Sequence, residues 1–162
     1  EFIPRFRSVF DDFGVSPQNF ELEITETTLM TDARRMVRLL DELRAMGVHL
    51  SIDDFGTGYS SLAALQQFPV GTLKIDRGFV RHATVSRDDA ALVRTIVEMG
   101  RNLNLEVLAE GIETVEQLAF LRGLGCHYGQ GQLFGEPMAA DELLTLMLGQ
   151  ARGERRFAAL FG

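Results

Sequence analysis

Segments typical of strands and of helices alternate along almost the whole chain, and this alternation restricts the folds open to it. Apolar or alternating runs predict strands at five places, over residues 20–25, 48–52, 72–75, 106–109 and within 125–134. Segments with helical spacing of apolar residues or with a capping signal lie between them, among them 32–46, 86–103 and 114–123. No linker rich in Pro, Gly or Ser interrupts the series. Such alternation predicts βα units around a parallel sheet.

The chain length limits how this sheet can close. A complete (β/α)₈ barrel usually needs about 250 residues, whereas this chain has 162. Two arrangements fit five βα units: a doubly wound sheet, or part of a TIM-type (β/α)₈ barrel. We expect one α/β domain over residues 1–149, followed over 150–162 by an Arg-rich terminal tail or a docked helix.

Ionisable or amide side chains stand at or beside the end of every predicted strand. In parallel α/β folds the carboxyl ends of the strands share one face, where loops build the active site. We therefore expect these side chains to converge. They are Glu23, Glu26, Asp53, Asp54, Lys74, Asp76, Glu110, Glu113 and Gln130.

Several carboxylates in one small space favour a bound cation, because like charges raise each other's pKa. Oxygen ligands suit Mg²⁺ or Mn²⁺, and two such ions about 3.5–4 Å apart can hydrolyse phosphodiesters. A single carboxylate at a strand end is more often a helix cap or a solvated turn residue. Five strands in succession weaken that explanation, but the pattern alone leaves both interpretations open.

Composition excludes several function classes. The formal net charge of −7 argues against non-specific binding to duplex nucleic acid, and no apolar run approaches the length needed to span a membrane. The single cysteine, Cys126, allows no internal disulfide, as expected of a cytoplasmic protein. The three histidines lack zinc-ligand spacing. Lys74 is the only lysine in the chain.

Five segments in order resemble the motifs of EAL-domain phosphodiesterases. They are FELEITETTLM (20–30), IDDFGTGYSSL (52–62), LKIDRGFV (73–80), VLAEGIET (107–114) and GCHYGQGQLF (125–134). The resemblance implies a (β/α)₈-type barrel in which two Mg²⁺ or Mn²⁺ ions support hydrolysis of cyclic di-GMP, a bacterial second messenger, to linear pGpG. It also implies a cyclic dinucleotide as ligand.

The resemblance assigns roles to individual residues. Lys74 matches the lysine near the attacking water, and Asp53 matches an aspartate that bridges the two ions. The positions that match metal ligands are Glu23, Asp53, Asp54 and Glu110, so that Asp53, Lys74 and Glu110 form the expected catalytic set.

Three further residues match supporting positions of the family site. Gln130 matches a glutamine beside the metals, and Glu113 matches an acid that lies behind the metal ligands or is held there through water. Glu26 matches a glutamate that holds the loop after Asp54, a loop tied in the family to substrate binding and dimer contacts.

The sequence also departs from the family pattern. The Glu-Ala-Leu motif and an asparagine ligand are expected upstream of residue 1. His127 and Gly71 stand where aspartate is common, Gln132 stands where tyrosine is usual, and Gly135-Glu136 replaces Ser-Arg. We therefore expect little phosphodiesterase activity from this chain alone.

An incomplete barrel would leave the edge of the strand near residues 21–25 open, which predicts a homodimer, domain swapping or pairing with an upstream segment. Two alternatives to an enzyme remain: a non-catalytic EAL module that binds cyclic di-GMP or a protein partner, and an inert half-barrel.

Overall fold

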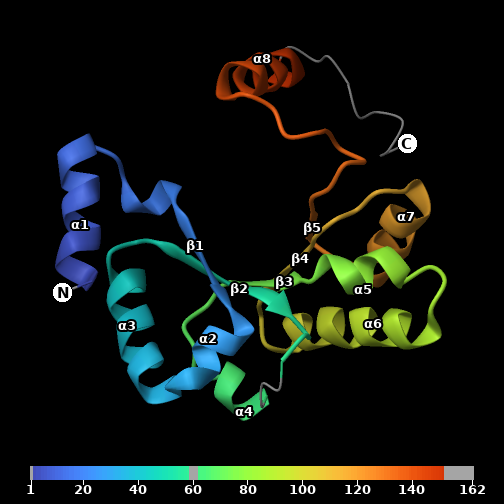
Figure 1. Ribbon diagram of the computed structural model, residues 1–162, viewed down its shortest axis with the longest axis horizontal. Coiled ribbons are helices and arrows are strands. Elements are labelled where there is room, and N and C mark those ends of the chain that lie inside the picture. The colour runs from blue at the N-terminus through green and yellow to red at the C-terminus, as the bar shows by residue number, and fades with distance from the viewer. Residues whose placement is uncertain (1, 59–61, 152–162) are drawn as a thin grey trace.

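The computed structural model describes residues 2–58 and 62–151, and its centre is a five-stranded parallel sheet. The strands follow one another across the sheet in chain order, which confirms the predicted βα units (Figure 1). They are β1 (Glu21–Thr25), β2 (His49–Phe55), β3 (Thr72–Ile75), β4 (Glu106–Ala109) and β5 (Tyr128–Gly129).

Helices connect the strands and flank both ends of the series. They are α1 (Phe2–Phe13), α2 (Glu26–Thr31), α3 (Ala33–Ala45), α4 (Leu62–Leu65), α5 (Arg77–His82), α6 (Arg87–Asn102), α7 (Val115–Leu124) and α8 (Ala140–Ala151), with a 3₁₀ turn, η1 (Pro17–Asn19). The longer helices lie where the sequence predicts them. The two six-residue helices, α2 and α5, were not predicted, because a segment of six residues is too short to show a clear helical period.

The predicted capping signals are present at the starts of α6 and α7. Ser86 Oγ accepts a hydrogen bond from the Asp89 amide at 3.2 Å. Thr114 and Gln117 form a reciprocal capping box, in which each side chain accepts from the other residue's amide. These caps fix where the connection from α5 to α6 and the loop after β4 end.

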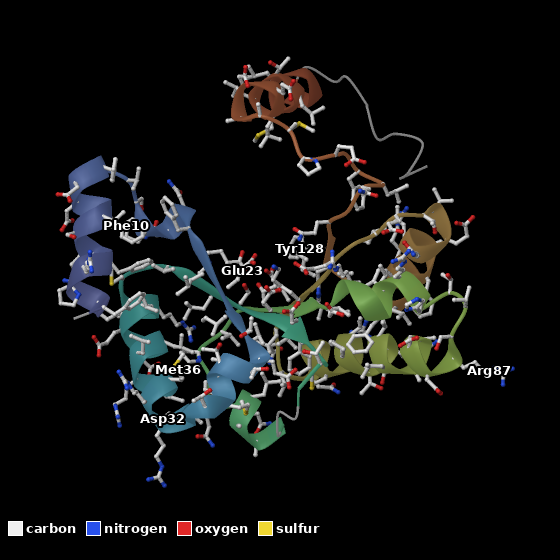
Figure 2. All side chains as sticks on the ribbon, in the orientation of Figure 1. Phe10, Glu23, Asp32, Met36, Arg87 and Tyr128 are labelled. Carbon is white, nitrogen blue, oxygen red and sulfur yellow. The ribbon has the colours of Figure 1, made fainter. Side chains whose placement is uncertain are left out.

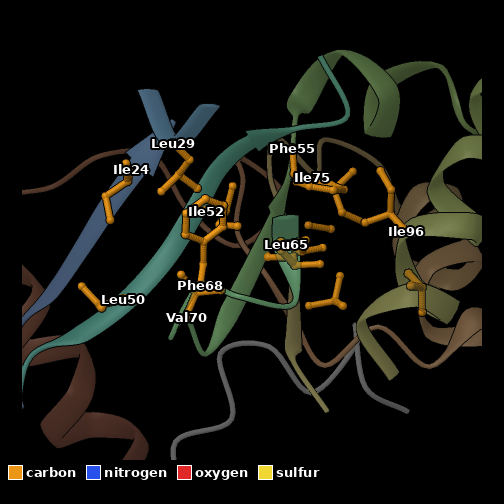
Figure 3. Packing of buried hydrophobic residues seen from close by; sticks show 14 of the residues in the cluster. Ile24, Leu29, Leu50, Ile52, Phe55, Leu65, Phe68, Val70, Ile75 and Ile96 are labelled. Atoms are coloured by element: carbon orange, nitrogen blue, oxygen red, sulfur yellow. The ribbon is translucent and has the colours of Figure 1, made fainter. Parts of the chain in front are cut away.

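One face of the sheet carries a continuous apolar row that packs on the helices. The strand register places Ile52 beside both Ile24 and Leu73, and Leu73 beside Val107, and all four are buried. A Cβ on Gly100 of α6 would overlap the Val107 side chain, so α6 lies directly against this face. Figure 3 shows Ile24, Ile52 and neighbouring apolar side chains packed around β1 and β2.

Side chains alternate across a strand, so the opposite face of the sheet receives the residues in between. That face is polar: Ser51 and Lys74 are buried on it, and Glu106 lies exposed on it. Glu23 and Tyr128 lie over this region, whereas Arg87 points away at the far end of the molecule (Figure 2). The strand register thus places Glu23 and Lys74 on the same face.

The C-terminal helix α8 stands apart from the sheet (Figure 1). Four of its large apolar side chains are about half exposed: Leu143, Leu144, Met147 and Leu148. Within the described residues, no helix is long and apolar enough to cross a membrane. Apart from the end of α8, the tail predicted for 150–162 lies outside the described residues.

Candidate metal centre

The single lysine of the chain lies at the centre of the strand-end residues. Lys74, on β3, has only 4% of its side chain exposed. Its Nζ atom lies 2.7 Å from Glu23 Oε1, 2.6 Å from Glu110 Oε1 and 3.2 Å from Asp53 Oδ1. These carboxylates come from β1, the loop after β4, and β2, so the parallel sheet brings together groups up to 87 residues apart in sequence.

The Lys74 ammonium stays protonated in this environment. Burial lowers its pKa, but the adjacent carboxylates of Glu110, Glu23 and Asp53 outweigh burial and leave the pKa above its ordinary value. Lys74 therefore carries a positive charge among these carboxylates.

An irregularity at the end of β2 brings two consecutive aspartates into the cluster. In a regular strand Asp53 and Asp54 would point to opposite faces. The pairing with β3 shifts register between Ile52 and Phe55, and Asp54 has a φ of 51°, in the left-handed region that aspartate tolerates better than most residues. Oxygens of Asp53, Asp54 and Glu110 consequently all lie within 4.8 Å of one another.

Asp54 lies among other carboxylates. Burial, followed by the charges of Asp53 and Asp76, raises its pKa above the ordinary value. Asp76 begins α5, where its Oδ1 accepts from the Gly78 amide at 2.9 Å. Asp76 carries the same strand-end signal as the predicted ligands, but it was not among the residues to which we assigned a role.

One carboxylate oxygen of the cluster lacks a hydrogen-bond donor. Asp53 Oδ1 is buried, and its contact with Lys74 Nζ does not have hydrogen-bond geometry; among the residues that the structure describes, no other group donates to it. A buried, unsatisfied anionic oxygen is costly. Three carboxylates, from Glu23, Asp53 and Glu110, contact one ammonium, and an Asp54 oxygen lies within 4.8 Å of oxygens of Asp53 and Glu110. This donor set fits a hard divalent cation such as Mg²⁺ or Mn²⁺.

Gln130 supports the cluster from the edge of the sheet. Its Nε2 donates to Glu110 Oε1 at 3.0 Å, the same oxygen that Lys74 contacts. Its amide donates to the Ala109 carbonyl at 2.9 Å, and its carbonyl accepts from the Ile112 amide at 3.0 Å. Glu110 is thereby oriented by donors from both sides.

Glu26 and Glu113, the other two predicted supporting residues, lie in different surroundings. Glu26 is 2% exposed, and its Oε2 accepts from the amides of Gly56 and Gly58 at 2.9 and 3.1 Å. It thus holds the start of the loop that follows Asp54. Glu113 is exposed, and its carboxylate forms no hydrogen bond or ion pair with any residue in the described ranges. It is not one of the residues whose oxygens lie within 4.8 Å of one another.

Known proteins resemble this chain in both sequence and fold. The EAL domain family model matches residues 1–137. The chain is 52% identical over 132 residues to MucR of Pseudomonas aeruginosa, a bifunctional diguanylate cyclase/cyclic di-GMP phosphodiesterase, covering 82% of this chain and 19% of MucR. It is 44% identical over 145 residues to the cyclic di-GMP phosphodiesterase NbdA of the same organism, covering 88% and 18%. The chain thus spans about a fifth of the length of these relatives.

Solved structures agree with these matches. The MucR phosphodiesterase in complex with c-di-GMP superposes with a TM-score of 0.84 at 48% identity, covering 87% of this chain and 57% of that one. Klebsiella pneumoniae BlrP1, solved with manganese and cyclic di-GMP, gives a TM-score of 0.76 at 34% identity, covering 83% and 34%. The mixed α/β fold with its parallel sheet matches these TIM-barrel-like neighbours, which confirms the predicted fold class. The chain belongs to the EAL domain family, the family of cyclic di-GMP phosphodiesterases.

Proposed function

We propose that this chain carries part of a metal-dependent site that hydrolyses cyclic di-GMP to linear pGpG. The observation that carries the proposal is the cluster itself: Asp53, Asp54 and Glu110 offer oxygens within 4.8 Å of one another beside the Lys74 ammonium. The relatives named as phosphodiesterases and the neighbours solved with the dinucleotide support it.

Divalent ions, Mg²⁺ or Mn²⁺, would be held by Glu23, Asp53, Asp54 and Glu110. When bound, such ions lower the pKa of a coordinated water and neutralise charge on a phosphate. Asp53, whose Oδ1 lacks a donor, would help to hold both ions.

The chain's own residues then have distinct tasks. Lys74, held protonated, places a positive charge where a water and a phosphate oxygen would meet, and so stabilises developing negative charge. Gln130 keeps Glu110 oriented through its 3.0 Å bond. Glu26 fixes the loop after Asp54 at the entrance to the site.

We further propose that the chain by itself turns over slowly. Mg²⁺ takes about six ligands in near-octahedral geometry. The four carboxylates that we assign as ligands cannot fill two such shells, which leaves many positions to water. The same observation favours a second candidate, a module that binds cyclic di-GMP without cleaving it.

The test compares Glu110→Gln with Glu98→Gln, a matched change at an exposed position on α6. We expect calorimetry to show Mn²⁺ binding by the wild-type chain and by Glu98→Gln, with affinity about tenfold to a hundredfold weaker in Glu110→Gln. Calorimetry with cyclic di-GMP and Ca²⁺, and a turnover assay with Mn²⁺, separate binding from hydrolysis. Equal Mn²⁺ affinity in the two variants would refute the metal site. Turnover well above that of Lys74→Ala would refute the slow-chain proposal.

We also propose that another segment covers the edge of β1, either a second copy of the chain or part of a longer protein. A groove of about 320 Å³ runs beside this edge and is lined mostly by apolar side chains, including Leu22, Ile24, Met36 and Leu39. Open parallel edges are seldom left uncovered. Light scattering at tens of micromolar protein tests the homodimer, and a monomer at that concentration contradicts it.

We propose a cytoplasmic location, which the lone, half-buried Cys126 supports.

A further inference from the structure

We propose that His127 is a positioning residue whose Nδ1 atom replaces a main-chain acceptor at the start of β5, and thereby sets where Gln130 stands against Glu110. The inference deepens the proposed function and rests on it in one respect, namely that the position of Gln130 matters to a bound ion.

Main-chain groups of β4 point alternately to its two neighbouring strands. The Glu110 amide donates to the Ile75 carbonyl on the β3 side, whereas the Ala109 carbonyl accepts from the Gln130 amide on the β5 side. Val107 lies two residues before Ala109, so its amide and carbonyl also face β5. A longer β5 would place a main-chain carbonyl opposite that amide.

Strand β5 is too short to supply this carbonyl. It consists of two residues, and its pairing with β4 begins only at Leu108 opposite Tyr128. The Val107 amide instead donates to His127 Nδ1 at 3.1 Å. An Nδ1 atom that accepts a hydrogen bond carries no proton, so the neutral ring holds its proton on Nε2. Beside it, Cys126 Sγ lies 3.4 Å from the Val107 carbonyl oxygen.

The segment between His127 and Gln130 has little freedom to absorb a displacement. It spans four residues, and Gln130 is bonded at its far end to Ala109, Ile112 and Glu110. The next residue, Gly131, lies so close to Ile112 that a Cβ would overlap its main chain. A segment tied at both ends over so few residues moves as a unit, so the hydrogen bond at His127 also restrains Gln130.

Burial and ring stacking do not explain His127. The residue is exposed, and its ring centroid lies 6.4 Å from that of Tyr128, in a tilted arrangement. The hydrogen bond to Val107 is therefore its main structural contribution. A carboxamide oxygen at this position could accept the same bond, which makes Asn the informative replacement.

The experiment uses the full 162-residue chain and compares His127→Ala, His127→Asn and the control His49→Ala. His49 is exposed and makes no side-chain hydrogen bond to a described residue. Amide hydrogen exchange by NMR follows Val107, Gln130 and Ile112, and calorimetry measures Mn²⁺ affinity. We expect His127→Ala to exchange about tenfold faster at Val107 and Gln130, with Mn²⁺ affinity about threefold to tenfold weaker. His127→Asn should recover both, and His49→Ala should change neither.

Each other outcome overturns a defined claim. Unchanged exchange at Val107 or at Gln130 in His127→Ala refutes the positioning role. Faster exchange with unchanged Mn²⁺ affinity refutes its link to the metal centre. If the wild-type chain binds no Mn²⁺, the proposed function fails, while Gln130 exchange still decides the positioning role. If His127→Ala does not fold, ¹⁵N NMR of the wild-type ring at about pH 8, where an ordinary imidazole is neutral, decides it, because a proton on Nδ1 excludes the bond.

Discussion

The two ends of the sheet differ in charge although the same strands build both. At the carboxyl ends, oxygens of Asp53, Asp54 and Glu110 lie within 4.8 Å of one another beside Lys74, and negative charge is in excess. At the amino ends, a cavity of about 340 Å³ is lined by glycine, apolar and polar residues together with Arg44 and Glu106, whose charges have opposite sign. We call these regions the mouth and the base.

The difference in charge implies that the mouth lowers the stability of the metal-free chain in favour of binding a cation. Like charges held together oppose folding, and only a cation offsets them fully. The base has no such excess, so its contribution to folding should not depend on ions. This matches the division of labour in parallel α/β folds, in which strand carboxyl ends carry chemistry and amino ends carry stability.

The largest expected effect is at the centre of the mouth. Lys74→Met removes the ammonium and leaves its carboxylate partners without a counter-charge, which should lower the free energy of unfolding by about 3 kcal/mol. Urea denaturation measures it. The matched change at the base, Arg44→Met on an exposed side chain, should cost less than about 0.5 kcal/mol. Equal losses at the two sites would remove the distinction between mouth and base.

The second effect is stabilisation by metal. Mn²⁺ at about one hundred times its dissociation constant should raise the free energy of unfolding by about 2.7 kcal/mol. Thermal unfolding should show this shift in the wild-type chain and in Arg44→Met, but not in Asp53→Asn, which loses an anionic ligand. A full shift in Asp53→Asn would place the ion elsewhere.

The third effect changes sign with the metal. Asp54→Asn removes a carboxylate whose pKa is raised by burial and by the charges of Asp53 and Asp76. Because its ionised form is disfavoured in the folded state, the metal-free chain should become more stable by about 0.5 kcal/mol or more. With Mn²⁺ present the variant should be the less stable one. Asn tolerates the φ of 51° at this position, whereas Asp54→Ala should be strained, and it serves as the control. A variant with the same rank in both conditions would contradict the proposal.

The sequence predicts the strands and long helices because each has enough residues to show its period. The segment 86–103 displays more than four helical turns and an N-cap, and the structure places α6 there within one residue at each end. Helices α2 and α5 have six residues each and give no comparable signal. Convergence of the strand-end residues likewise follows from the parallel sheet.

The detailed site geometry could not be predicted, because it depends on tertiary packing. The register shift that brings both Asp53 and Asp54 into the cluster depends on how β2 meets β3. The distance between strand ends decides that Lys74 contacts Glu23 and Glu110, whereas the described residues show no such contact for Glu113. Local patterns identify candidates at each strand, but not which of them touch.

The smallest effect tests whether mouth and base communicate through β5. Cys126, near the base end of β5, has a pKa raised to about 11 by burial, against an ordinary value of 9.0. Near neutral pH its alkylation by iodoacetamide should therefore be about a hundredfold slower than in the unfolded chain, rising about tenfold per pH unit up to about pH 11.

If His127 links Gln130 to β4, then Mn²⁺ at the mouth must in turn hold this segment more firmly, because coupling between sites is reciprocal. Saturating Mn²⁺ should slow alkylation of Cys126 by about threefold or less, and His127→Ala should abolish this protection while His49→Ala keeps it. Faster alkylation with Mn²⁺ would mean that ion binding loosens β5. An unchanged rate would mean that the two ends of the sheet are independent at this strand, so that the contrast between them would hold without any connection along β5.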